Sequence, residues 1–345
     1  MRFQFRIRTG LFLFVALAEP VAALAGISVA DCARAANYSE KKRGVSMLVM
    51  QNGRILFQHY VPGAAPEGRW PIFSGTKSFW GIAALCAARD HLINLDDRVA
   101  DTIKEWKRDP RKSQITIRQL LNFTDGIEGA PHLHRASIRD RDAIAIRLRC
   151  IEQPGTAFIY GPSHLQIFVE LLRRKLDGRS PISYLQSNVL DPLGLDSLEF
   201  KKDARGNPLA ASGFELTAEE WARFGELVLH RGDYEGHQIV PSGLLRQALT
   251  GSEANPCYGL TFWLNRQAAR AAEVDVEKQI DLPWPRAHWA SACFSRVAPP
   301  DMAVALGSDS QRLFIIPSMN AVIVRQGRGA KFSDARFIGL ILGRR

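Results

Sequence analysis

A serine and a lysine stand three residues apart at the beginning of an apolar segment, Trp70-Pro-Ile-Phe-Ser74-Gly-Thr-Lys77-Ser-Phe-Trp-Gly-Ile-Ala-Ala-Leu85. In a helix this spacing is about one turn, so both side chains would lie on one face within reach of each other. A serine hydroxyl becomes a nucleophile when a nearby base takes its proton, and lysine becomes such a base when burial disfavours its charged form. The segment therefore favours nucleophilic catalysis by Ser74 with Lys77 as the base.

The same pattern also has a purely structural explanation. Ser-x-x-Lys occurs a second time in Ser39-Glu-Lys-Lys42, within a polar stretch that has no catalytic features. Serine is also favoured at the first position of a helix, so Ser74 could simply cap the helix that follows. The interpretation of Ser74 and Lys77 therefore needs support from the rest of the chain.

The N-terminus has the layout of a secretory signal peptide. Three arginines precede an apolar run over residues 11–17, and Ala23-Leu-Ala25 offers a cleavage site. The apolar run is too short for a spanning helix, although an uncleaved N-terminal anchor is the alternative. We therefore expect residues 1–25 to be a signal peptide, the mature form to have no integral membrane span, and the protein to be an exported bacterial protein, periplasmic or secreted.

The chain of 345 residues is basic, with a formal net charge of +10 at pH 7. Cleavage after residue 25 would lower this charge to about +8, because the removed segment holds three arginines and one glutamate. The basic residues are scattered, and no motif for binding nucleic acid is present. We therefore expect no nucleic-acid partner, whereas an affinity for an anionic cell envelope stays open.

The five cysteines do not resemble a metal site. Their number is odd, so at least one would be unpaired in an exported protein. Cys86 lies in the apolar segment and is expected to be buried. Cys257 could pair with Cys293, and Cys150 with either of them. No spacing is that of a zinc site, and a mechanism built on side chains and water needs no cofactor.

Other residues that could carry chemistry give weaker signals. None of the eight histidines shows the spacing of metal ligands or of a catalytic triad, and His132 and His134 are expected in an exposed loop. Trp263, Trp284 and Trp289 could line a substrate groove or pack in the core.

The elements that would position these side chains follow from the sequence pattern. Two β-rich runs, 45–51 and 54–60, flank Asn52-Gly53, which is the strongest short signal for a hairpin. Apolar periodicity and caps predict helices over about 74–89, 115–121, 165–176, 217–230 and 333–342. Three short apolar runs predict antiparallel strands at 302–306, 312–316 and 321–325. Residues 265–290 are expected to form a long surface loop.

The order of elements is a hairpin, a long helical middle, a β-meander and a terminal helix. If the first and last strands join one sheet, the middle must be an insertion packed against that sheet. This organisation is an α+β arrangement with a split domain.

In its motifs the chain resembles the serine β-lactamase and penicillin-recognising superfamily, in the branch of the class C β-lactamases and related esterases and amide hydrolases. The resemblance rests on six segments in the order of the family: Ser74-Gly-Thr-Lys77, Leu120-Leu-Asn-Phe-Thr-Asp-Gly-Ile127, Pro154-Gly-Thr-Ala-Phe-Ile-Tyr160-Gly-Pro-Ser163, Asp191-Pro-Leu-Gly-Leu195, Ala211-Ser-Gly213 with 217–224, and 311–318 with 321–324. Each segment is weak alone, but six in register are a specific signal.

The resemblance implies a β-lactamase/transpeptidase-like α+β fold. In this fold an antiparallel sheet is formed by the N- and C-terminal segments, with helices on both faces and a mostly helical inserted region. The mature chain is then divided into an N-terminal segment, 26–44, and a serine hydrolase domain, 45–345, whose helical subregion covers about 95–290.

The resemblance also implies roles for particular residues. Ser74 would form an acyl-enzyme, with Lys77 and Tyr160 as a general base/acid pair, because a cation at Lys77 lowers the pKa of the phenol. The oxyanion needs two donors, of which the Ser74 N–H is one. The third motif of the family falls on Ala305-Leu-Gly307, so the Ser308 N–H is the candidate for the other, although an ordinary hairpin turn at 307–310 fits equally.

Two departures from the family pattern bear on the substrate. The third motif lacks the cation that helps to hold the carboxylate of β-lactam and D-Ala-D-Ala substrates, unless Arg325 or Lys331 supplies it. Pro162 replaces the asparagine of the second motif and has no amide to offer, so that contact is absent or moves to Ser163 or His164. We therefore expect an esterase or amidase that acts on a small-molecule or peptide-like acyl substrate. A ligand-binding or scaffold protein that retains the fold without catalysis is the alternative.

Overall fold

The structure is a computed structural model that describes residues 26–196, 198–266, 271–280 and 286–344. The signal peptide predicted for residues 1–25 lies outside the described residues and stays a prediction. Within the described ranges, no helix has both the length and the apolar character needed to cross a membrane.

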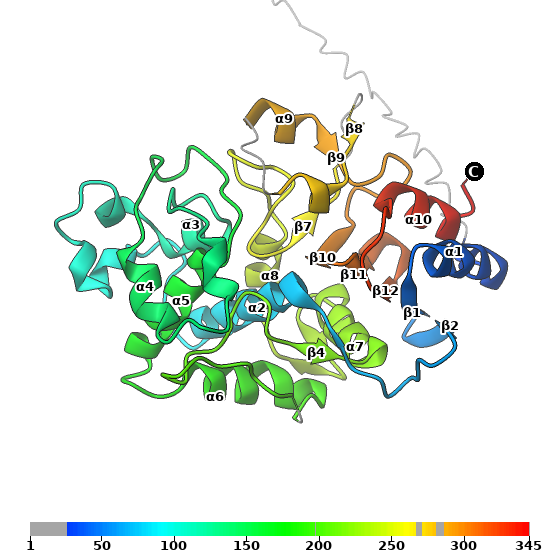
Figure 1. The fold of residues 1–345 in the computed structure, drawn as a ribbon, viewed down its shortest axis with the longest axis horizontal. Coiled ribbons are helices and arrows are strands. Elements are labelled where there is room, and N and C mark those ends of the chain that lie inside the picture. Colours follow the sequence, from blue (N-terminus) through cyan, green and yellow to red (C-terminus); the bar gives the residue numbers. More distant parts are fainter. Residues whose placement is uncertain (1–25, 197, 267–270, 281–285, 345) are drawn as a thin grey trace, which may run out of the picture.

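A six-stranded antiparallel sheet with the strand order β2-β1-β12-β11-β10-β7 forms the centre of one half of the molecule (Figure 1). The predicted hairpin consists of β1 (Gly44–Gln51) and β2 (Arg54–Tyr60). Its turn residues Asn52 and Gly53 have φ of 54° and 71°, which explains why Asn-Gly stands there.

The predicted meander completes this sheet. Its strands are β10 (Ala303–Gly307), β11 (Gln311–Ile316) and β12 (Ala321–Gly327), and β12 pairs antiparallel with β1. The short β7 (Trp263–Leu264) pairs with β10 at the edge. The N- and C-terminal segments therefore share one sheet, as the sequence predicts.

Helices cover both faces of the sheet. Leu313 and Phe314 are neighbours on β11, so their side chains point to opposite faces. Leu313 meets α7 (Ala218–Leu229), where a Cβ added to Gly225 would lie 3.0 Å from it. Phe314 packs against Phe337 of α10 (Asp334–Ile341), with ring centroids 5.9 Å apart.

The first helix was not predicted from the sequence. Residues 26–44 hold α1 (Val29–Lys41), which packs against α10 and β1. Its N-cap is Ser28, whose hydroxyl accepts a hydrogen bond from the Asp31 N–H at 3.1 Å. This N-terminal segment is therefore part of the layer that covers the sheet.

The region between β2 and β10 is mostly helical, as expected. Every residue of α2 (Thr76–Arg89) from Thr76 to Ala87 is buried, so this helix is apolar on all sides because it runs through the interior. Around it lie α3 (Ile117–Leu121), α4 (Arg141–Arg147), α5 (Ser163–Lys175), α6 (Pro181–Leu185) and α8 (Ser242–Ala248), with the two-residue strand pairs β3 (Trp70–Pro71) with β4 (Glu215–Leu216) and β5 (Asp233–Tyr234) with β6 (His237–Gln238).

The prediction of a surface loop over 265–290 is wrong for the residues described there. The strand β8 (Ala272–Glu273) pairs in parallel with β9 (Ala292–Cys293), and α9 (Arg286–Ala290) lies between them. Val276 and Trp289 are buried in the core. Such two-residue pairings between distant segments leave no periodic signal in the sequence. Trp284 lies outside the described residues.

All five cysteines lie in the described part of the chain, and each has a free thiol. Cys86 is fully buried, as expected. The pairings considered for Cys257, Cys293 and Cys150 are thus not formed in this structure.

Candidate active site

The predicted nucleophile lies just before α2. Ser74 is the middle residue of a short helical turn, Phe73–Gly75, that leads directly into the helix. Phe73 has a φ of +45°, a left-handed conformation that is unfavourable for a bulky residue and persists only when its surroundings hold it. A Cβ on Gly75 would lie 2.7 Å from the Trp221 ring. Packing of this turn against α7 therefore holds Ser74 in a constrained position.

Lys77 points back at this hydroxyl. Its Nζ donates a hydrogen bond to Ser74 Oγ at 2.7 Å and another to the Ala211 carbonyl at 3.1 Å. The cap of α2 is Gly75, without a side-chain cap bond, so the Ser74 hydroxyl is engaged by the lysine and does not cap this helix. The spacing in the sequence therefore brings the two groups together as predicted.

The environment of Lys77 favours its neutral form. The side chain is 1% exposed, and burial lowers its pKa from 10.5 to about 7. Burial is the cause of this shift, and among the described residues no carboxylate is identified that raises the pKa again. A substantial fraction of Lys77 is thus neutral near pH 7 and able to accept a proton.

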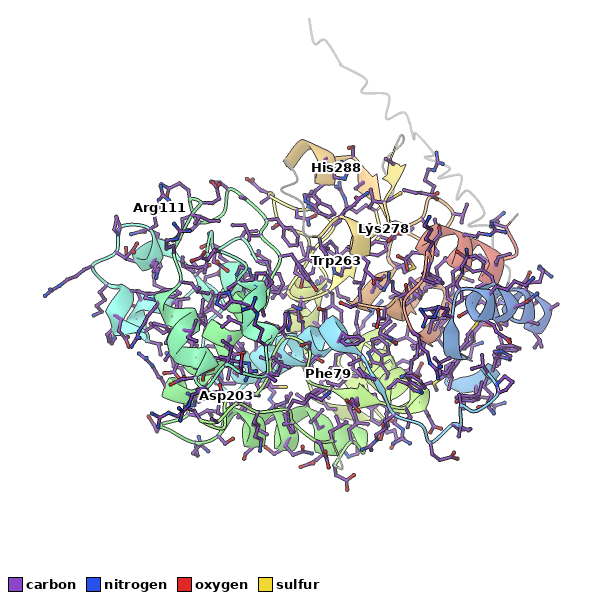
Figure 2. The ribbon with its side chains drawn as sticks, viewed as in Figure 1. Phe79, Arg111, Asp203, Trp263, Lys278 and His288 are labelled. Atoms are coloured by element: carbon purple, nitrogen blue, oxygen red, sulfur yellow. The ribbon has the colours of Figure 1, made fainter. Side chains whose placement is uncertain are left out.

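Tyr160 lies next to the same amine. The Lys77 Nζ is 4.8 Å from the centre of the Tyr160 ring. The ring is partly exposed and rests on buried aromatic side chains, with centroids 5.5 Å from Phe123 and 5.7 Å from Trp263. Trp263 lies near the middle of the molecule (Figure 2). It is buried in the core, which is one of the two roles expected for it, the other being to line a substrate groove. Tyr160, which is distant in the sequence, therefore lies beside the amine that contacts Ser74.

The loop that carries Tyr160 is fixed by two glycines. A Cβ on Gly161 would lie 2.1 Å from the Gly129 carbonyl oxygen, and a Cβ on Gly129 would lie 2.5 Å from the Tyr160 carbonyl oxygen. The two loops cross so closely that no side chain fits at either position. This crossing holds the phenol against α2.

The predicted oxyanion segment lies beside the nucleophile turn. Gly307 ends β10 against that turn, and a Cβ there would lie 2.0 Å from the Ile72 carbonyl oxygen. Ser308 is exposed and begins the turn into β11, where its carbonyl accepts the Gln311 N–H at 3.3 Å. The segment is therefore a hairpin turn that also adjoins Ser74, which is where a second oxyanion donor is needed.

The residues proposed to replace the missing asparagine are turned to other partners. Ser163 is buried at the start of α5, and its Oγ donates to the Glu128 carbonyl at 2.8 Å. His164 is also buried, with Nδ1 2.6 Å from an Asp125 carboxylate oxygen. This placement favours a role in holding α5 to the preceding loop over contact with substrate.

Neither basic residue considered for the missing charge is shown to replace it. Arg325 is buried and donates to the Ser310 carbonyl at 2.6 Å and the Lys42 carbonyl at 2.8 Å, and burial, followed by the nearby Arg312, lowers its pKa to about 10. Its guanidinium is thus committed to the protein. Lys331 is exposed in the loop after β12.

One neighbour of the site was missed by the sequence analysis. His134 Nδ1 lies 2.9 Å from the Oγ of Ser212, the residue after Ala211, whose carbonyl binds Lys77. Part of the His134 ring is open to solvent, but its burial on the other sides, followed by the charges of Lys77 and Arg141, lowers its pKa to about 4. The Ala211-Ser-Gly213 segment was the only signal in the sequence, and this segment does not predict which histidine contacts Ser212.

Within the described residues, no group of His, Cys, Asp or Glu side chains is arranged to hold a metal ion.

The family model of the beta-lactamases matches residues 29–324, most of the chain and all of the site just described. The chain belongs to the beta-lactamase family.

Two curated relatives are similar over shorter stretches. Protein flp of Staphylococcus aureus (strain N315) is 26% identical over 189 residues, which cover 50% of this chain and 38% of that protein. The monacolin J acid methylbutanoyltransferase of Aspergillus terreus is 26% identical over 204 residues, 50% of this chain and 49% of the fungal protein. The chain thus matches less than half the length of these relatives.

Solved structures confirm that the fold is that of this family. EstCE1, described as a hydrolase with promiscuous acyltransferase activity, superposes with a TM-score of 0.66 at 16% identity, covering 91% of this chain and 98% of that one. A D-stereospecific amidohydrolase from Streptomyces gives a TM-score of 0.64 at 15% identity, covering 89% and 96%. The octameric penicillin-binding protein homologue from Pyrococcus abyssi gives 0.66 at 17% identity, covering 91% and 76%. The β-lactamase/transpeptidase-like fold predicted from the sequence is confirmed.

Proposed function

We propose that this protein is a serine hydrolase that cleaves an ester or amide bond through an acyl-enzyme on Ser74. The observation that carries this proposal is the hydrogen bond of 2.7 Å between Lys77 Nζ and Ser74 Oγ, made by a lysine that burial keeps partly neutral. A hydroxyl that touches a neutral amine has a base in place to remove its proton. An inert scaffold has no need to bury an amine beside a serine.

The reaction would proceed in two halves. Lys77, directly or through the Tyr160 phenol, accepts the proton of Ser74, and Oγ attacks the carbonyl carbon of the substrate. The N–H groups of Ser74 and Ser308 would stabilise the oxyanion of the tetrahedral intermediate. The pair then returns the proton to the departing alcohol or amine, which leaves Ser74 acylated. In the second half a water molecule, deprotonated by the same pair, attacks the acyl carbon, and the acid product departs as Ser74 regains its proton.

The proposed substrate class rests on the cation that the third motif lacks. Arg325, one candidate for the missing cation of the third motif, is bound to backbone carbonyls, so we infer an acyl substrate without the carboxylate that this cation holds. The names of the similar proteins support acyl chemistry of this kind, since one is a hydrolase with promiscuous acyltransferase activity, one a D-stereospecific amidohydrolase and one a methylbutanoyltransferase. Membership of the class C branch, export and affinity for an anionic envelope stay predictions.

The test compares two hydroxyls on neighbouring turns. Wild type should hydrolyse p-nitrophenyl acetate and become labelled by a fluorophosphonate probe, and Ser74→Ala should abolish both. Ser78→Ala is the matched control, because Ser78 is a buried serine next to Lys77 whose Oγ donates to the Thr261 carbonyl. This variant should keep the turnover within about threefold.

Intact mass decides between the hydrolase and the alternative of a binding or scaffold protein. Incubation with acyl esters should give an adduct on wild type that Ser74→Ala lacks. A folded wild type that neither labels nor hydrolyses any member of an ester and amide panel would refute the hydrolase and leave the scaffold.

A further inference from the structure

The turn after β10 has an unfavourable backbone. Asp309 and Ser310 are consecutive residues with φ of +60°, and neither is a glycine. L-residues with a side chain adopt this left-handed conformation mainly at the central positions of tight hairpin turns, where glycine, asparagine and aspartate are favoured. Ser310 is not one of these residue types, so contacts from outside the hairpin help to hold its conformation.

Those contacts come from two charged side chains, of which Arg325 is buried and Glu277 is partly exposed. The Glu277 carboxylate accepts the Ser310 N–H at 3.1 Å, and Arg325 donates to the Ser310 carbonyl at 2.6 Å. Both backbone groups of Ser310 are thus satisfied by side chains from other segments. Lys278, the residue after Glu277, is labelled in Figure 2, which has the same view as Figure 1.

Arg312 joins Glu277 to the other end of the turn. Its Nη1 donates to the Gly307 carbonyl at 3.0 Å, and its Nη2 lies 2.9 Å from the Glu277 carboxylate. Its Nε is held by Asp334 at 2.7 Å, and the Arg312 side chain is 1% exposed. A buried guanidinium with a carboxylate on each side keeps a defined position, because any displacement leaves charge unpaired in the interior.

We propose that Glu277 and Arg312 are positioning residues, which hold the 307–310 turn so that the Ser308 N–H faces the oxyanion formed at Ser74. This inference rests on the proposed function. Gly307 touches the Ile72 carbonyl two residues before the nucleophile, so a shift of the turn changes the distance between the two donors. Donors stabilise a transition state only when they are in place before charge develops.

Glu277→Ala tests the proposal, because the Glu277 side chain is 25% exposed and its removal is less disruptive than that of Arg312. We expect kcat for p-nitrophenyl acetate to fall about tenfold while KM stays within twofold, as for a loss confined to the transition state. The affinity for phenylboronic acid, which forms a tetrahedral adduct on a serine, should weaken by the same factor. Glu277→Gln keeps an oxygen for the Ser310 N–H and should lose only about threefold.

Glu273→Ala is the matched control. The Glu273 side chain is 30% exposed and also accepts a backbone N–H, that of Arg296 at 2.8 Å, but it does not hold the 307–310 turn. Its kcat should stay within twofold of wild type. Equal losses in Glu273→Ala and Glu277→Ala, or a Glu277→Ala variant with unchanged kcat and boronate affinity, would overturn the proposal.

Hydrogen exchange separates failure of this inference from failure of the proposed function. A wild type without turnover or labelling contradicts the hydrolase, but the amides of residues 307–311 still report on the turn. They should exchange at least tenfold faster in Glu277→Ala than in wild type and Glu273→Ala. Unchanged exchange overturns the role of Glu277 whether or not the protein is a hydrolase.

Discussion

The two sides of the site are held by opposite kinds of interaction. On one side, Ser74 and Lys77 stand on α2, whose residues from Thr76 to Ala87 are all buried in an apolar interior. On the other side, the 307–310 turn is held by Arg312 between the carboxylates of Glu277 and Asp334. On the apolar side burial favours the neutral form of an amine, which makes it a base, whereas on the charged side Arg312, paired with two carboxylates, holds the backbone of the turn.

This contrast separates chemistry from stability. A buried lysine with a lowered pKa is a cost to the folded state, because the unfolded chain solvates its charge freely. A buried arginine between two carboxylates is costly to disrupt, because removing it leaves a carboxylate unpaired in the interior. Substitution by methionine, which is close in size to both side chains, should therefore have different effects on the free energy of unfolding at the two positions.

Lys77→Met should abolish activity without destabilising the fold. We expect turnover to fall by about 10³-fold or more, since general base catalysis and activation of the nucleophile are lost together. The free energy of unfolding at pH 7 should be unchanged or higher. The unfolded chain binds the lysine proton up to about pH 10.5, whereas the folded chain releases it near pH 7. The free energy of unfolding of wild type, relative to that of Lys77→Met, should therefore increase as the pH rises from 7 to 10.5. Ester turnover and urea unfolding at pH 7 and pH 10 measure both effects, and a strongly destabilised Lys77→Met would contradict the first half of the comparison.

Arg312→Met should instead destabilise the fold. We expect the free energy of unfolding to fall by about 3–5 kcal/mol, the cost of breaking a buried pair and leaving Asp334 unpaired. Arg118→Met is the matched control, because Arg118 pairs with Asp96 at 2.7 Å in an ion pair whose acid is 66% exposed. Its cost should stay below about 1 kcal/mol. Urea unfolding of both variants decides, and similar losses would show that burial of the ion pair is unimportant.

The sequence predicted the apolar side of the site far better than the charged side. Ser74 and Lys77 are three residues apart, so a local spacing was enough, and the meander followed from runs of apolar residues between turns. Tyr160 required the resemblance to a family, since nothing local connects it to α2. The roles of Glu277 and Arg312 could not be predicted from the sequence. Arg312 is 35 residues from Glu277 and 22 residues from Asp334, and an isolated charged residue is normally solvated. The pairing of β8 with β9 was missed for the same reason, since its two strands are distant in the sequence, whereas α1 carries a local cap signal at Ser28 that was overlooked.

Tyr160→Phe sharpens the comparison within the apolar side. The variant keeps the ring that packs on Phe123 and Trp263 and removes only the hydroxyl. If the phenol relays protons between Lys77, the nucleophile and the leaving group, kcat should fall about 10–10²-fold while fluorophosphonate still labels Ser74 slowly. Phe158→Leu, a change in the neighbouring ring of the same cluster, controls for altered packing and should have less than a threefold effect on kcat. A Tyr160→Phe variant as active as wild type would leave Lys77 as the sole proton carrier.

The smallest effect concerns the cause of the lowered pKa of Lys77. Burial is the cause identified for it. The pH profile of kcat/KM for an ester should therefore have its midpoint near pH 7, and below this midpoint kcat/KM should fall about tenfold per pH unit as the base becomes protonated. His134 is the titratable neighbour beside Ser212, but its pKa of about 4 keeps it uncharged throughout this range. His134→Asn should therefore leave the midpoint within about 0.3 units and change kcat/KM less than threefold, because a neutral ring exerts little electrostatic effect on the amine. A midpoint that rises by a full unit in His134→Asn would mean that the imidazole carries charge near pH 7 and that repulsion, as well as burial, sets the base.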